Sequence, residues 1–163
     1  MTELRTERLR LRPVATSDVA ALVEHQTNPE VMRYVPGGAR ARAAVEALVA
    51  GSDAQWKASG HGLFALSHQE TGELVGYCGL IVVAEAVELD MILAEEHWTQ
   101  GIGTEAAAAV IEFARAKGIA KLVALPHDAN VAAHRVCEKN GMSPNGSAKL
   151  QGVTCVRYEL ALS

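Results

Sequence analysis

Hydrophobic and polar positions alternate with a period of two in several short stretches, and this spacing is typical of strands. Near the N-terminus, Leu9 and Leu11 alternate with arginines as far as Pro13, which ends the strand. The pair Thr71-Gly72 is typical of a hairpin turn between two such strands. The pattern predicts further strands over residues 62–68, 74–83, 86–94, 121–125 and 152–162, and a turn with a partner strand over 143–150.

Helical spacing of apolar positions occurs between these strands. The stretch TSDVAALVEHQ begins with residues that cap helices and places Val19 and Leu22 on one face. A short helix is also predicted over residues 28–35, because Asn28 can cap it and Pro29 suits its first position. The remaining predicted segments are a loop over residues 36–39, a helix over 40–57, a helix that ends at Gly118, and a helix from Asn130 to Gly141.

This order of elements predicts an α/β (α+β) fold, in which a mixed sheet carries helices on both faces. The chain has 163 residues, a length that suits one domain with a substantial hydrophobic core. No internal repeat, linker or low-complexity segment interrupts the pattern. We therefore expect residues 1–163 to form a single domain.

Composition and charge narrow the possible functions. The formal net charge of −4 argues against nucleic acid as the main ligand, because phosphate backbones are bound by basic surfaces. No apolar run is long enough for a membrane span and no signal peptide is present, so a cytoplasmic protein is expected. The three cysteines, Cys78, Cys137 and Cys155, are widely spaced without a zinc-binding pattern, so we expect reduced thiols and no metal site.

The stretch HWTQGIGTEA (residues 97–106) places two glycines between the end of a predicted strand and the start of a helix. The first N–H groups of a helix have no partner inside it and carry the positive end of its dipole. Glycine would let a phosphate approach them, so residues 100–104 are interpreted as a pyrophosphate cradle. The stretch lacks the lysine of a P-loop and the third glycine of a dinucleotide fingerprint. An ordinary tight strand-to-helix turn is the alternative.

The strand before this stretch carries two carboxylates. Strand alternation puts Leu89 and Met91 on an apolar face, and Glu88 and Asp90 together on the opposite face. Two carboxylates that are two residues apart on one face can raise each other's pKa and attract a cationic amine. A pair of solvated carboxylates is the alternative.

The stretch HWTQGIGTEA resembles the acetyl-CoA-binding motif of the GNAT N-acetyltransferase superfamily. Three further stretches, TERLRLRP, NPEVMRYV and NVAAHRVCEKNGM, agree with that family in order and spacing. The resemblance covers nearly the whole chain and is closest to the branch that acetylates ribosomal-protein N-termini (the RimJ/RimL-like branch). It implies a mixed, twisted sheet that splays between two parallel strands, with helices on both faces, and acetyl-CoA as the donor.

The resemblance also implies roles for individual residues. Backbone N–H groups at Gly101 to Thr104 would hold the pyrophosphate, and Glu88 would be the general base beside the substrate cleft. Asn130, the second catalytic candidate beside Glu88, would contact the cofactor near its pantetheine arm, whereas Arg135 would meet either a phosphate of the cofactor or solvent. The strand end at Met91, Ile92 and Leu93 would pair with pantetheine and provide a backbone N–H for the thioester oxygen. The other residues expected to bind the cofactor are Gln100, Gly101, Ile102, Gly103, Thr104, Asn130 and Arg135.

The sequence departs from the family pattern at two positions. Ala133 stands where the N-terminal-acetylating branch usually has serine. Cys137 stands where many superfamily members have a tyrosine that protonates the leaving thiolate, although this branch commonly has an aliphatic residue there. No side-chain acid is therefore identified by the resemblance.

We expect an N-acetyltransferase that moves an acetyl group directly from acetyl-CoA to a primary amine in a ternary complex. The acceptor would be a protein N-terminus or a small-molecule amine. A detoxifying acetyltransferase for small molecules and a non-catalytic acyl-CoA-binding or regulatory domain are the alternatives. A homodimer formed through the terminal strands is compatible with this fold.

Overall fold

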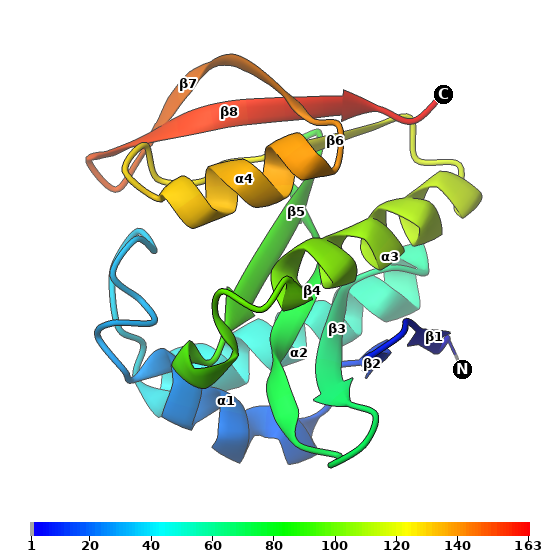
Figure 1. Ribbon diagram of the computed structural model, residues 1–163, viewed down its shortest axis with the longest axis vertical. Coiled ribbons are helices and arrows are strands. Elements are labelled where there is room, and N and C mark those ends of the chain that lie inside the picture. Colours follow the sequence, from blue (N-terminus) through cyan, green and yellow to red (C-terminus); the bar gives the residue numbers. More distant parts are fainter. Residues whose placement is uncertain (1) are drawn as a thin grey trace.

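The computed structural model describes residues 2–163, which form one eight-stranded sheet flanked by helices (Figure 1). The strands are β1 (Leu4–Arg5), β2 (Leu9–Pro13), β3 (Leu63–His68), β4 (Leu74–Val83), β5 (Ala86–Leu93), β6 (Lys121–Ala124), β7 (Ser143–Leu150) and β8 (Val153–Ala161). The helices are α1 (Val19–Gln26), α2 (Arg42–Ser59), α3 (Ile102–Ala116) and α4 (Val131–Lys139), with short 3-10 helices η1 (Thr16–Asp18) and η2 (Glu95–His97). The predicted mixed α/β architecture is confirmed.

The strand order in the sheet is β1-β2-β3-β4-β5-β6-β8-β7. Neighbouring strands run antiparallel except β5 and β6, which are parallel and share a single register pair, Glu88 with Val123. Antiparallel pairing can use short hairpins, whereas the parallel pair needs the long crossover through α3. Among the described residues, β5 has no strand partner beyond Glu88 along the edge that faces β6. The expected splay of the sheet occurs there.

The helices cover both faces of the sheet (Figure 1). Apolar residues of α1 and α2, including Leu22 and Val45, pack with Tyr77 and Ile92 on one face. The helices α3 and α4 pack on the other face, where Ala106 and Val110 lie one helical turn apart and are fully buried. Small residues at such positions let α3 approach the sheet closely. Along residues 2–163, no helix combines the length and the hydrophobicity required to cross a bilayer.

The predicted helix over residues 28–35 is wrong, because this segment forms a series of turns. One hydrogen bond with helical spacing joins the Met32 N–H to the Asn28 carbonyl at 3.2 Å, but no further i to i−4 hydrogen bonds follow it in this segment. Pro36 disfavours helical torsions at the preceding residue and lacks an N–H, so the segment is too short to propagate a helix. Met32, which is fully buried, anchors these turns to the α1–α2 core. The long second helix begins at Arg42 rather than at residue 40.

Candidate active site

The loop between β5 and α3 is fixed by local hydrogen bonds and by two residues with positive φ. The Trp98 indole N–H donates to the Leu93 carbonyl at 3.0 Å, and Arg8 Nη1 donates to the Gln100 carbonyl at 2.8 Å. Thr99 has φ +61° and Gly101 has φ +79°, so the chain reverses sharply before α3 begins. The helix therefore starts directly beyond the end of β5.

The N-terminus of α3 presents backbone N–H groups without a side-chain cap. Gly101 is the N-cap, and the first N–H that has an acceptor in the preceding turn is that of Glu105, which donates to the Gly101 carbonyl at 3.1 Å. Helical geometry gives the N–H groups of Ile102, Gly103 and Thr104 no acceptor within the helix. These donors and the positive end of the helix dipole favour an anion at this position.

The two glycines of the stretch serve different physical purposes. Gly101 requires left-handed torsions, and a Cβ there would lie 3.4 Å from Arg8 Nη2. A Cβ at Gly103 would instead lie 3.1 Å from Met91 Cε and 3.5 Å from Val136 Cγ2. Gly103 thus lets α3 pack closely on β5 and α4, and Gly101 shapes the turn.

Arg8 and Glu105 clamp the N-terminal strands onto the first turn of α3. Arg8 donates to the Glu105 carboxylate from its backbone N–H at 2.9 Å and from Nε at 2.8 Å, and the Thr6 hydroxyl donates to the same carboxylate. Burial alone would raise the pKa of Glu105, but these hydrogen bonds from Thr6 and Arg8 hold it below its usual value. The clamp fixes the position of the α3 N-terminus relative to the sheet.

Replacing Glu105 by glutamine is expected to lower the free energy of unfolding by about 1–3 kcal/mol at pH 7, because charge-assisted bonds to partly buried donors are lost. A lowered folded pKa contributes stability above the unfolded value near 4.5, which is lost as the pH falls through the folded pKa. The difference between the two proteins should therefore vanish in acid. Urea unfolding of both proteins at pH 7 and below pH 4 measures this difference. Glu112→Gln is the control: Glu112 is exposed on the same helix, and its replacement should change the free energy of unfolding by less than about 0.5 kcal/mol.

Glu88 lies on the α1–α2 side of β5 and lines a cavity of about 450 Å³. The cavity is bordered by the β4–β5 hairpin, β6 and β8, and its other charged residues are Glu85, Lys121 and Arg157. Burial, followed by the charge of Asp90, raises the pKa of Glu88 to about 7. A carboxylate with this pKa is half ionised near neutral pH, as a general base requires.

Asp90 occupies the same face as Glu88 but is engaged in the fold. The Tyr77 hydroxyl donates to Asp90 Oδ2 at 2.7 Å, and Tyr77 is fully buried between β4 and the α1–α2 layer. Glu88 and Asp90, which share one face of β5, therefore lie in different environments. Glu88 makes no hydrogen bond or ion pair with the residues that the structure describes.

The predicted residues on α4 occupy different environments. Asn130 is the N-cap of α4, where its Oδ1 accepts from the Ala133 N–H at 3.1 Å, while its amide NH₂ takes no part in the cap. Arg135 is exposed on the helix surface. The predicted strand end at residues 91–93 lies at the unpartnered edge of β5 and leads into the loop at Gly101. The structure thus brings the strand end and the α3 N-terminus together, with Val136 of α4 beside Gly103, and the neighbouring Arg135 is exposed on α4.

A family model described as the acetyltransferase (GNAT) domain matches residues 8–143, which is most of the chain. The chain belongs to the GNAT acetyltransferase family. As a member of the GNAT family it is an N-acetyltransferase, and it is similar to the uncharacterised protein YkkB of Bacillus subtilis strain 168. The two are 33% identical over 147 residues, which cover 86% of this chain and 85% of YkkB.

Solved structures of acetyltransferases share the whole fold. The acetyltransferase from Agrobacterium tumefaciens strain C58 superposes with a TM-score of 0.87 and 28% identity, covering 98% of this chain and 94% of that chain. RimL, a ribosomal L7/L12 α-N-protein acetyltransferase whose structure was solved in complex with coenzyme A, superposes with a TM-score of 0.83, covering 98% of both chains. At 18% identity, the match to RimL shows the fold of this GNAT protein and nothing finer.

This GNAT protein has a buried thiol on α4, that of Cys137. Cys137 is 5% exposed in the core beneath α4, and burial raises its pKa to about 11. The thiol is therefore neutral at physiological pH and is a poor nucleophile. Ala133 contributes only its N–H, to the cap made by Asn130.

A tyrosine that sequence reasoning missed lies in the same core, on β8. The Tyr158 hydroxyl lies 2.9 Å from His134 Nδ1, and His134 Nε2 lies 3.0 Å from the Asp128 carbonyl. Because a carbonyl only accepts, Nε2 carries a proton, and in the neutral tautomer of the ring Tyr158 then donates to Nδ1. No local sequence pattern indicates this contact, because its partners are 24 residues apart.

Proposed function

We propose that this protein transfers the acetyl group of acetyl-CoA directly to a primary amine in a ternary complex, with Glu88 as general base. The proposal depends mainly on the partly buried Glu88 carboxylate, whose pKa is raised to about 7 and which lines a cavity of about 450 Å³. It agrees with the family and with the coenzyme A bound to RimL. The amine acceptor would be a protein N-terminus or a small molecule.

The residues that would hold acetyl-CoA fit its shape and charge. The unpaired N–H groups at Gly101–Thr104 suit the pyrophosphate, since they form an anion site at the start of α3. The unpartnered edge of β5 at Met91–Leu93 suits the amide groups of pantetheine, which would add to it as an extended chain. The Asn130 amide NH₂, which the cap leaves free, would contact the pantetheine arm, and Arg135 would meet a phosphate of the cofactor.

The proposed acetyl transfer requires one proton acceptor. The amine nitrogen bonds to the thioester carbonyl carbon, the carbon–sulfur bond breaks, and the proton of the amine passes to Glu88 Oε. A backbone N–H near Met91–Leu93 would stabilise the charge on the carbonyl oxygen. A thiol has a pKa of roughly 8.5, so the thiolate of coenzyme A leaves nearly unaided at neutral pH. The buried, neutral Cys137 is then compatible with turnover.

All described strands join one sheet, so we also propose that residues 1–163 act as one N-acetyltransferase domain. The outer strand β7 offers an unpaired edge through which two copies could associate, which supports the proposal of a homodimer. Analytical ultracentrifugation of the purified protein measures this directly.

Release of coenzyme A thiol with a panel of primary amines tests the proposed function. The panel contains peptides with free N-termini, polyamines, amino acids and aminoglycosides, and free thiol is measured against an amine-free blank. Amine-dependent thiol release together with acetylated product supports the proposal. Tight binding of acetyl-CoA without amine-dependent release would instead identify an acyl-CoA-binding domain.

The replacement of Asp90 by asparagine is expected to shift the acid limb of the pH–rate profile to lower pH. The charge of Asp90 contributes to the raised pKa of Glu88, and the asparagine still accepts the hydrogen bond from Tyr77. Activity at pH 6 should therefore increase relative to that at pH 8. Tyr77→Phe is the matched control, since it removes the hydrogen bond and keeps the charge. An Asp90→Asn profile that coincides with the wild-type profile would contradict the electrostatic coupling of the two carboxylates.

A further inference from the structure

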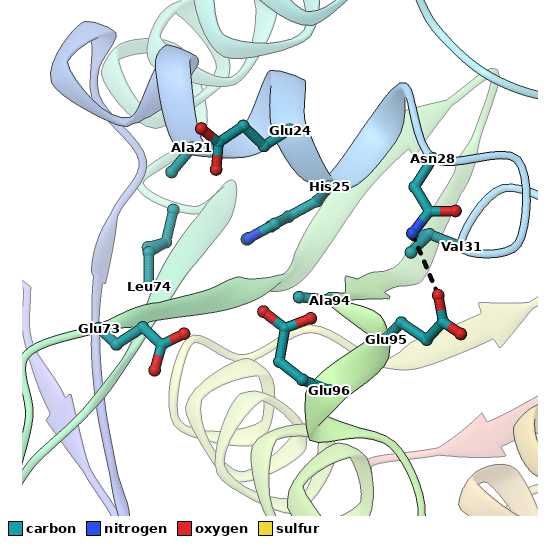
Figure 2. Close-up of a pocket in the computed structure, with 10 residues that line it drawn as sticks. All are labelled: Ala21, Glu24, His25, Asn28, Val31, Glu73, Leu74, Ala94, Glu95 and Glu96. Carbon is teal, nitrogen blue, oxygen red and sulfur yellow. Dashed lines mark hydrogen bonds between the residues drawn. The ribbon is translucent and has the colours of Figure 1, made fainter.

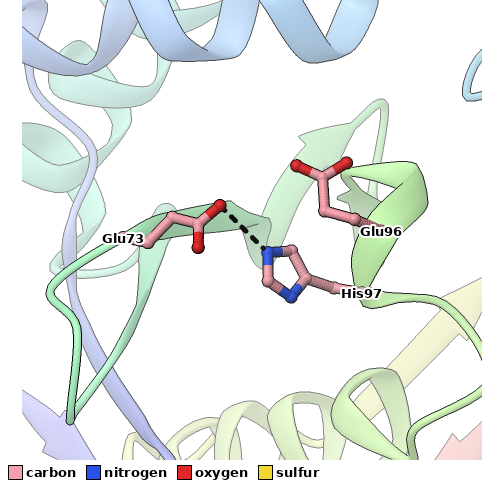
Figure 3. Close-up of side chains that lie close together, drawn as sticks. All are labelled: Glu73, Glu96 and His97. Carbon is pink, nitrogen blue, oxygen red and sulfur yellow. Dashed lines mark ion pairs between the residues drawn. The ribbon is translucent and has the colours of Figure 1, made fainter.

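Three side chains with metal-ligating atoms meet away from the proposed active site, beside the β3–β4 turn (Figure 3). Glu73 immediately precedes β4, and Glu96 and His97 belong to η2. Their ligand atoms all lie within 4.8 Å of one another. The closest recorded pair is Glu73 Oε1 and His97 Nε2, at 3.5 Å.

The His97 imidazole has a buried nitrogen without a hydrogen bond. Its side chain is only 12% exposed, and Nε2 has no hydrogen-bond partner among the described residues. An unsatisfied buried polar atom costs about 1–3 kcal/mol, so such atoms are rare without a function. Figure 3 shows this nitrogen directed towards Glu73, with the carboxylate of Glu96 close to the ring. A cation between these groups would satisfy the nitrogen and both carboxylates.

A second histidine approaches the same place from α1. His25, Glu73 and Glu96 line one cavity of about 350 Å³, and Figure 2 shows the His25 ring projecting into it towards the two carboxylates. His25 Nδ1 is also buried without a hydrogen-bond partner.

The charge of the cavity favours a cation. Its lining contains four glutamates, Glu24, Glu73, Glu95 and Glu96, and no lysine or arginine. The Asn28 side-chain amide donates to Glu95 at 3.1 Å, which leaves Glu73 and Glu96 as the carboxylates beside the histidines. Two imidazole nitrogens and two carboxylate oxygens are a ligand set that Zn²⁺ and similar divalent metals accept in tetrahedral geometry.

We propose that Glu73, Glu96 and His97, joined by His25, form a binding site for a divalent transition metal ion of the Zn²⁺ class. Four protein ligands would close the coordination sphere, which is typical of a structural site rather than a catalytic one. The ion would join α1, the β3–β4 turn and η2. Because His97 precedes Gly101 by four residues, the site would also brace the loop that enters α3. The proposal does not depend on acetyl transfer, since the ligands lie outside the residues assigned to it.

Calorimetric titration of Zn²⁺ into the full-length, chelator-treated protein tests the site in the absence of acetyl-CoA. We expect one ion per chain and a rise in the unfolding temperature on binding, and no comparable binding of Mg²⁺. Glu96→Gln and His97→Gln should each weaken Zn²⁺ binding by at least ~10-fold. Glu96 is exposed, so its replacement leaves the fold intact even if that of His97 does not.

Two control variants separate this site from adventitious binding. Glu95→Gln changes a neighbouring carboxylate of the same cavity and should retain wild-type affinity. His127→Gln removes a partly buried histidine outside the cluster, 3.0 Å from Asp128, and should also retain wild-type affinity. Zn²⁺ binding that is absent, that survives Glu96→Gln unchanged, or that is lost with His127→Gln would overturn the proposal. The absorption spectrum of the Co²⁺-loaded protein tests the fourth ligand. Bands typical of tetrahedral Co²⁺ that are weaker in His25→Gln than in the wild type would support His25 as a ligand. Bands that are the same in both proteins would exclude His25 from the site.

Discussion

Replacement of Glu88 by glutamine is expected to lower kcat/KM for a primary amine by about 10²–10⁴-fold at pH 8, because an amide cannot accept the proton of the attacking amine. In the wild-type protein, the pH dependence of kcat/KM should show an ionisation near pH 7 besides that of the amine itself, since burial and the charge of Asp90 raise the pKa of Glu88 to about 7. The variant should lack this inflection. Steady-state kinetics between pH 5.5 and 9 with one amine measure both effects.

The same substitution should make the protein more stable at high pH. A carboxyl group whose folded pKa lies above its unfolded value of 4.5 binds protons more tightly in the folded state, so wild-type stability falls as the pH rises from 4.5 to about 7. Glutamine cannot ionise, and Glu88→Gln should therefore exceed the wild type by about 1–3 kcal/mol at pH 8 and equal it below pH 4.5. Urea unfolding at both pH values measures the difference.

Loss of activity with a gain of stability separates a missing base from a damaged fold. Glu85→Gln is the matched control, because Glu85 lines the same cavity but is exposed on the β4–β5 hairpin. It should leave both kcat/KM and its pH dependence unchanged. An inflection near pH 7 that persists in Glu88→Gln would transfer the role of base to another group.

Local patterns predicted much of the fold because their physical causes are local. Alternation along β5 separated Leu89, which packs with the α3 layer, from Glu88 and Asp90 on the other face. The position of the two glycines also identified the start of α3. The helix predicted at residues 28–35 was based on a capping residue, Asn28, and on Pro29 at the first helical position. The segment is too short to propagate a helix, and the buried Met32 anchors it as turns.

Contacts between distant residues could not be predicted in this way. Arg8 and Glu105 are separated by 97 residues, so neither reveals the clamp that fixes the α3 N-terminus. Glu88 and Asp90 look equivalent in the sequence, and only the cross-strand neighbour Tyr77 distinguishes them. The cluster of Glu73, Glu96 and His97 likewise depends on the β3–β4 turn meeting η2, and the absence of a zinc-spacing motif led us to expect no metal site.

Replacement of Gly101 by alanine is expected to weaken acetyl-CoA binding by about tenfold or more, because the N–H donors of the cradle depend on the left-handed turn at this residue. Gly101 has φ +79°, and alanine in that region is strained by roughly 1–2 kcal/mol. A Cβ would also meet Arg8 Nη2 at 3.4 Å, on the guanidinium that holds the Gln100 carbonyl. Calorimetric titration with acetyl-CoA measures the change in affinity.

Gly118 provides a matched control at the other end of the same helix. It also has φ +79°, and a Cβ there would meet nothing within 4 Å. Gly118→Ala should therefore lower stability by a similar amount, roughly 1–2 kcal/mol, and leave acetyl-CoA affinity unchanged. Equal affinity losses in the two variants would mean that destabilisation of α3 alone explains the effect. A loss confined to Gly101→Ala would show that binding depends on the geometry of the α3 N-terminus, since the backbone strain is matched.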